Sequence, residues 1–235
     1  MRKDTVLVML AIVLLTLSEI TLLFNQLLGV IVYATWLLAL IIILTTKLTE
    51  PNKDLFTALA TIPTIRIFSL LLPIKGLYQM HIVYALFFVL TLINMYYLKI
   101  HPGERYKSKK YLLMIIPLFL ASFFRYFYET QTKMSLDYQS IALIIFISIT
   151  LSLFFYYVIQ NMLEKAFGFK GVVFTSIIIT ALSLGQYSIV GIGLTFITGL
   201  ILGLIYYENR RWYLIVIILS LLNILELIVL PYLRV

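Results

Sequence analysis

Four charged side chains stand inside or at the edges of apolar stretches of this sequence: Glu19, Arg66, Arg125 and Glu226. A charge in hydrocarbon is costly, and it marks either a functional site or a buried ion pair. Each lies three to six residues from the predicted outer end of its span, or roughly 5–9 Å deep at 1.5 Å per residue. We therefore predict one polar layer of two acids and two bases. One interpretation of this layer is a polar cavity open to the outer face.

A structural explanation stays open beside it. Glu19 and Arg66 form an ion pair in this alternative. Arg125 then extends to the interface and bonds Glu129, one helical turn further on.

The residue types that metal or covalent catalysis requires are scarce. The chain has no cysteine, its two histidines are His81 and His101, and no two acidic residues are adjacent. Catalytic zinc needs about three ligands from histidine, cysteine or carboxylate side chains. We therefore expect no metal site and no cofactor.

The composition indicates which elements must position these residues. Hydrophobic residues make up 63% of the 235 residues and charged residues 12%, against about 45–50% and about 25% in soluble domains. Apolar runs of about 20 residues recur, and each can cross a hydrocarbon core as a helix. We predict an all-α, polytopic transmembrane helical bundle that forms a single membrane domain over residues 1–235. The net charge of +8 comes from basic residues in short loops, so we expect contact with the lipid bilayer and no nucleic acid.

Nine spans are expected, with eight as the alternative. They cover residues 5–24, 27–46, 55–72, 80–98, 111–128, 139–161, 171–184, 189–207 and 212–231. With the N-terminus inside, 13 of the 18 basic residues fall in inner loops, three in outer loops and two within spans. This bias predicts a cytoplasmic N-terminus and an outer C-terminus.

Short motifs in the C-terminal part follow one another in an order typical of one membrane-protein family. They are Gln160 to Gly168, the small pair Thr175-Ser176, Phe196 to Gly199 with Gly203 and Tyr206, and the helix from Trp212 onward. Over residues 151–231 the chain resembles the CPBP (Abi) family, which includes CAAX-type prenyl endopeptidases. Residues 58–73 are similar to a stretch seen in many bacterial members. The resemblance implies N-terminal helices over 1–138, a CPBP-like core over 139–235, and a prokaryotic cell membrane.

The resemblance also implies where catalytic residues would stand. In the family, paired glutamates, an arginine and two histidines are thought to bind a metal and activate water. Here the matching positions hold Leu151, Ser152, Tyr156, Ser183 or Leu184, and Leu219, while only the motif's Asn223 is retained. Leucine supplies no ligand or base, so we predict an inactive family member. We expect these positions to form an apolar, water-poor contact in which Asn223 bonds a neighbouring helix.

Two further features have two interpretations each. Gly199 and Gly203 form a small-xxx-small face, which packs inside the chain or makes a dimer. A basic run attracts anionic lipid headgroups or only sets the orientation of the chain. Its residues are Arg105, Lys107, Lys109 and Lys110.

Three functions follow from these observations. The first is a catalytically silent CPBP-like protein that acts by binding or scaffolding, with a partner protein in the membrane. The second is an active intramembrane protease or hydrolase with rearranged residues. The third is a component of a transporter or channel that uses the outer polar layer, and an open cavity reaching Arg66 would favour it.

Overall fold

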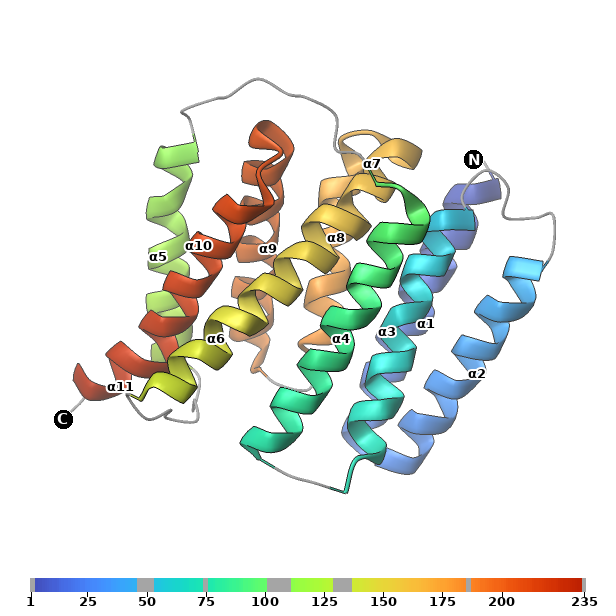
Figure 1. Cartoon of the computed structure of the whole chain (residues 1–235), viewed down its shortest axis with the longest axis horizontal. Coiled ribbons are helices and arrows are strands. Elements are labelled where there is room, and N and C mark those ends of the chain that lie inside the picture. Colours follow the sequence, from blue (N-terminus) through green and yellow to red (C-terminus); the bar gives the residue numbers. More distant parts are fainter. Residues whose placement is uncertain are drawn as a thin grey trace.

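The computed structural model is helical throughout its regular elements. It describes residues 3–45, 53–73, 76–100, 111–128, 137–184 and 187–233. Figure 1 shows the helices packed side by side as a bundle, which confirms the predicted all-α fold class.

The first half of the chain contributes five helices. They are α1 (Lys3–Phe24), α2 (Gln26–Thr45), α3 (Lys53–Leu71), α4 (Leu77–Leu98) and α5 (Tyr111–Tyr128). Asn25 separates the first two, because its Oδ1 accepts hydrogen bonds from the backbone N–H groups of Leu27 (2.9 Å) and Leu28 (3.2 Å). These bonds satisfy donors that the first turn of a helix leaves free.

The second half begins with one long, composite rod. It consists of α6 (Tyr138–Leu151), the π-helical segment η2 (Ser152–Gln160) and α7 (Asn161–Phe167). The rod therefore continues beyond residue 161, where we expected the sixth span to end. Four α-helices and a second π-helical segment complete the described chain: α8 (Lys170–Leu182), α9 (Ile189–Asn209), α10 (Trp212–Ile224), η3 (Leu225–Val229) and α11 (Leu230–Leu233).

Local residue chemistry explains several helix boundaries. Asp137 begins α6, because its Oδ1 accepts a hydrogen bond from the N–H of Ser140 at 2.7 Å. Ser188 caps α9 in the same way through Gly191. Gly168 ends α7 with φ of +63°, a conformation that glycine adopts without strain.

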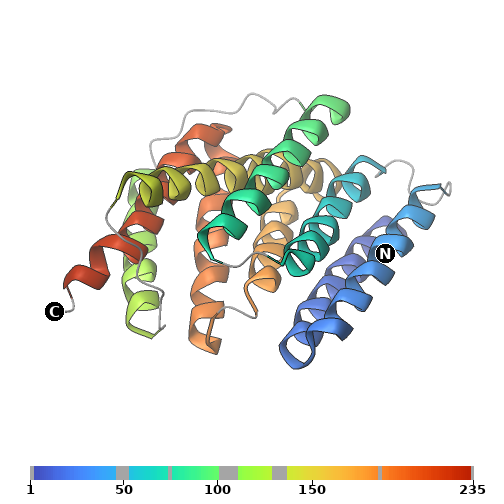
Figure 2. The ribbon, with the colours of Figure 1, turned by 60° about the horizontal axis from the view of Figure 1, so that its bottom comes forward.

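The composite rod runs obliquely across the bundle, from α10 beside α6 to α8 beside α7 (Figures 1 and 2). Eight of the nine η2 residues are buried, and η2 contacts α3, α4, α8, α9 and α10. Helices from the two halves of the chain also pack against each other, α1 against α8 and α5 against α9. The largest core is thus built around η2.

Seven helices in the described residues are long and apolar enough to cross a membrane. Two more apolar helices are shorter, within Met114–Tyr126 and Lys170–Leu182. Each predicted span therefore corresponds to a helix, but two of the nine are short. Large apolar side chains such as Leu27 and Ile42 are 69% and 64% exposed, which suits a surface in contact with lipid tails. The chain is an integral membrane protein.

The helix ends fall into two sets (Figure 1). The chain passes between α1 and α2, between α3 and α4, and between α8 and α9 at the end that we call the lower end. The N-terminus and the passages between α7 and α8 and between α9 and α10 lie at the opposite, upper end. This alternation matches the predicted order of loops. Which end faces the cytoplasm stays a prediction.

Candidate functional site

A cavity of about 430 Å3 lies in the lower half of the bundle. Its walls come from α3, α4, α8, α9, α10 and the junction of α6 with η2, with one side chain from α5. Met80, near the lower end of α4, lines the cavity and is 40% exposed. The cavity therefore reaches the surface beside that helix end.

The predicted pair of Glu19 and Arg66 forms. Arg66 Nε donates to Glu19 Oε1 at 2.7 Å, and the Tyr33 hydroxyl donates to the same oxygen at 2.6 Å. Arg66 Nη2 also donates to the backbone oxygen of Leu182 at 2.8 Å. One arginine therefore connects α1, α2, α3 and α8.

Arg125 and Glu226 form a second buried pair. The Arg125 Nε lies 3.1 Å from Glu226 Oε1, and Nη2 bonds the same oxygen. Nη1 contacts Thr195 Oγ1 at 3.4 Å, and the guanidinium lies 5.4 Å from the Tyr187 ring centre. The expectation that Arg125 reaches the interface is wrong, because the residue is only 8% exposed. Glu129, its expected partner, lies outside the described residues.

The two pairs are oriented in the same way relative to the cavity. Arg66 and Arg125 both line it, whereas Glu19 and Glu226 do not. The exposed fraction of the side chain is 24% for Arg66 and 3% for Glu19. Among the described lining residues, the charged groups are therefore guanidiniums, and their carboxylate partners stand behind them.

The positions singled out by the family motifs converge on this same cavity. Leu151, Tyr156, Ser183, Leu219 and Asn223 all line it, although they come from three different helical rods. The expectation of a closed contact between them is wrong, because they surround a hollow rather than fill it.

The other motif positions behave differently. Ser152 is fully buried, with no hydrogen-bond partner for its hydroxyl, and neither Ser152 nor Leu184 is among the lining residues. Asn223 Nδ2 donates to Ser148 Oγ of α6 at 3.3 Å. The expected bond from Asn223 to a neighbouring helix is therefore confirmed.

The glycine face of α9 packs inside the chain. A Cβ at Gly199 would lie 3.3 Å from Ser176 Oγ, and one at Gly203 would lie 2.9 Å from Val172 Cγ1. Both neighbours belong to α8. The close approach of α8 and α9 therefore occupies this face, and the interpretation as internal packing holds.

A third ion pair, which we did not predict, lies in the upper half. Arg210 bonds Glu164 through Nη2 and Asn161 Oδ1 through Nη1 at 2.6 Å. Asn161 also donates to the Tyr206 hydroxyl at 2.7 Å, and Gln160 Nε2 donates to Glu164 Oε1 at 2.7 Å. We call these five residues the upper network. The predicted spans end at residues 161 and 207, so sequence analysis places Glu164 and Arg210 in loops and gives no reason to expect a buried pair.

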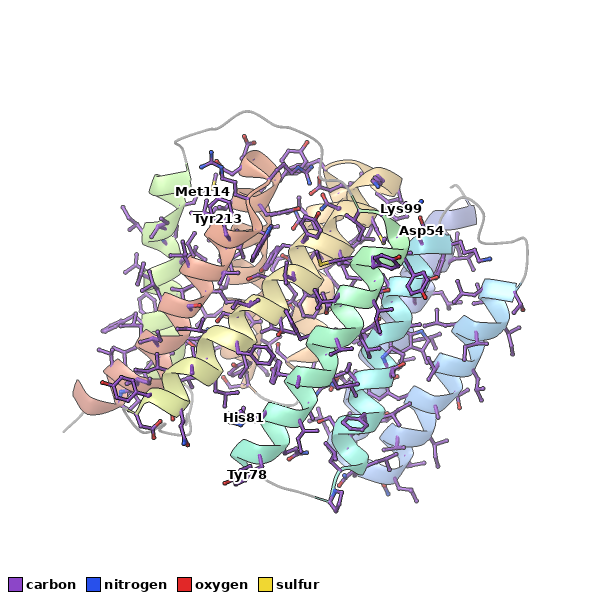
Figure 3. The ribbon with its side chains drawn as sticks, viewed as in Figure 1. Asp54, Tyr78, His81, Lys99, Met114 and Tyr213 are labelled. Carbon is purple, nitrogen blue, oxygen red and sulfur yellow. The ribbon has the colours of Figure 1, made fainter. Side chains whose placement is uncertain are left out.

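The structure offers little for metal binding. No group of three histidine, cysteine, aspartate or glutamate side chains gathers within the described ranges. His81 lies at the lower end of α4, near Tyr78 (Figure 3), and its side chain is exposed. The basic run of Arg105, Lys107, Lys109 and Lys110 lies outside the described residues.

No family model matches the chain, and the searches of curated proteins and of solved structures found no match.

Proposed function

We propose that this protein is a catalytically silent, CPBP-like membrane protein that binds a ligand in its central cavity. The observation that carries the proposal is the convergence of Leu151, Ser183, Leu219 and Asn223 on one hollow. These positions come from three separate segments of the sequence, and they were selected by the family motifs alone. A shared cavity is what a common site requires.

The residue types at these positions support binding rather than hydrolysis. A metal-dependent hydrolase needs ligands for the metal and a base for the attacking water. Leu151 and Leu219 offer neither, and Ser183 donates its hydroxyl to Thr180 O at 2.8 Å in its own helix. The retained Asn223 is held by Ser148.

The cavity itself supports a ligand of moderate size. Its volume of about 430 Å3 lies within the roughly 300–1,000 Å3 typical of small-molecule sites, which are mostly apolar with a few polar groups. Its lining combines apolar side chains such as Phe155 and Leu202 with polar ones such as Arg66 and Thr198.

A carrier is the second candidate. The cavity reaches Arg66 and the lower surface, while the upper network fills the opposite half of the core. A cavity that is open at one end of the bundle, with the opposite half closed, is one of the two states that alternating access requires.

A cavity-filling substitution tests the binding function. Leu219→Trp places an indole in the cavity, and Leu221→Trp is the matched control, because Leu221 is 50% exposed on the outer face of the same helix. Native mass spectrometry of protein purified in mild detergent should detect a bound small molecule in the native chain and in Leu221→Trp, but not in Leu219→Trp. Equal occupancy in all three would refute the cavity as the binding site.

Metal content tests catalytic silence separately. Elemental analysis of the purified protein should find no stoichiometric zinc, and any peptide cleavage should be insensitive to chelators. Stoichiometric metal that is lost together with activity on chelation would instead restore the protease interpretation.

We also propose that the upper end faces the cytoplasm, as the distribution of basic residues indicates. The native chain has no cysteine, so single cysteines report position cleanly. Two positions suit the test, Tyr138 at the start of α6 and Lys165 in α7, because both side chains are exposed. Each is replaced by cysteine in a separate variant. An impermeant thiol reagent outside intact cells should label the first and spare the second. The reverse pattern would invert the topology.

A further inference from the structure

We infer that the ligand of this cavity is an anionic amphiphile, whose charged headgroup binds Arg66 and whose apolar tail occupies the deeper part. This inference rests on the proposed binding function and names the chemical class of its ligand.

The charge of the wall indicates an anionic headgroup. Among the described residues that line the cavity, the two charged ones, Arg66 and Arg125, are arginines, and their carboxylate partners are not part of the lining. The charged groups that a ligand in the cavity can contact are therefore guanidiniums. Arginine is also the residue that best matches carboxylate and phosphate oxygens, through paired N–H donors.

Arg66 keeps donors available for such a ligand. A guanidinium has five N–H groups. Nε bonds Glu19, and Nη2 bonds Glu19 and Leu182 O. Nη1 makes no hydrogen bond within the described residues, and the side chain is 24% exposed. Because Glu19 and Leu182 hold the guanidinium in place, these free donors are oriented in advance.

Polar side chains gather around Arg66 in the lower part of the lining, and large apolar side chains line its deeper part. Ser69 and Gln79 lie beside Arg66 at the lower ends of α3 and α4. Phe87, Phe155 and Leu219 lie nearer the middle of their rods. A ligand with a polar group at its lower end and an apolar part further in fits this lining.

Matched probes separate the parts of this inference. Lysophosphatidate is a single-chain anionic lipid, monoacylglycerol of the same chain is its neutral counterpart, and inorganic phosphate is the headgroup alone. Binding is measured by isothermal titration to the full chain in mild detergent. We expect lysophosphatidate to bind at least about tenfold more tightly than either other probe, because charge-assisted hydrogen bonds are lost without the phosphate.

Two variants test the role of Arg66. Glu19→Gln removes the carboxylate that competes for the guanidinium, so affinity for lysophosphatidate should rise. Glu19→Gln combined with Arg66→Gln leaves no uncompensated charge, yet affinity should fall about tenfold or more. Lys165→Gln is the control, because Lys165 is an exposed base on α7, away from the cavity. This variant should bind lysophosphatidate with the affinity of the native chain. A purely structural pair would not tighten binding when Glu19 alone is neutralised.

The remaining outcomes are decisive as well. Equal binding of the anionic and neutral lipids, blocked by Leu219→Trp, would overturn the anionic headgroup and leave the binding function intact. Phosphate binding as tight as lysophosphatidate would overturn the amphiphile in favour of a soluble anion. Binding of no probe would overturn the inference, while a different small molecule that co-purifies with the native chain would still support the binding function.

Discussion

The upper and lower halves of the bundle both contain an arginine–glutamate ion pair, but the surroundings of the arginine differ. In the upper network, Arg210 contacts Glu164 and Asn161 and lies 5.5 Å from the ring centres of Tyr206 and Tyr207. These four residues surround the guanidinium of Arg210. In the lower half, Arg66 is bonded on one side and faces a cavity on the other. A buried arginine is thus evidence for a site only when part of its surface has no protein neighbour.

The glycines of α9 follow the same division. Gly203 packs between Val172 and Gln160 in the filled part of the core. Gly199, one turn lower, touches Ser176 but also lines the cavity. The hollow therefore begins within a single helical turn of α9.

The largest effect should follow from breaking the upper pair. Glu164→Leu leaves Arg210 as an uncompensated buried charge and should destabilise the protein by about 3–5 kcal/mol. Replacing both residues with leucine should recover much of this loss. Thermal unfolding in detergent measures both changes. A double variant as unstable as the single one would show that the network acts through its hydrogen bonds to Asn161 and Gln160 rather than through its charges.

A smaller effect should follow in the lower half. Arg66→Met should destabilise by about 2 kcal/mol, because the Arg66 side chain is 24% exposed against 10% for Arg210 and Glu19 keeps its hydrogen bond from the Tyr33 hydroxyl. Glu19→Leu with Arg66→Met should again recover stability, with a coupling of roughly 0.5–3 kcal/mol in a double-mutant cycle. Plain additivity would mean that the two charges do not stabilise each other.

The smallest effect concerns packing. Gly203→Ala should cost about 1–3 kcal/mol, because the new Cβ would lie 2.9 Å from Val172 and 3.1 Å from Gln160. Gly193→Ala is the control on the same helix: nothing lies within 4 Å of its Cβ position, so better helix propensity should stabilise by up to about 1 kcal/mol. Equal effects at both positions would contradict the filled upper core.

Sequence reasoning predicted the helices well, because runs such as residues 5–24 are uniformly apolar and polar turns such as Asn25 interrupt them. It also predicted the Glu19–Arg66 pair, because two opposite charges stood at similar depths. It could not choose Glu226 as the partner of Arg125, since depth alone also allowed Glu129. The π-helical winding of Ser152 to Gln160 has no local signal in the sequence, because the segment holds no proline or glycine and most of its residue types also occur in α6.

The cavity was beyond sequence reasoning for a related reason. The motifs indicated that Leu151, Ser183 and Leu219 belong together, but their apolar character predicted contact. Whether apolar residues touch or surround a space depends on how far apart the backbones stand. That distance is set by the whole bundle, including the close approach of α8 and α9 at Gly203.

The pairing of Arg125 with Glu226 has a consequence for how the protein is made. The two residues are 101 positions apart, so a ribosome that adds roughly 5–20 residues per second synthesises the glutamate roughly 5–20 s after the arginine. Until then α5 is in place without the Glu226 carboxylate that pairs with its guanidinium. A nascent chain that stops before Leu225 therefore lacks the Glu226 carboxylate, and the buried pair that joins α5 to the last helices cannot form.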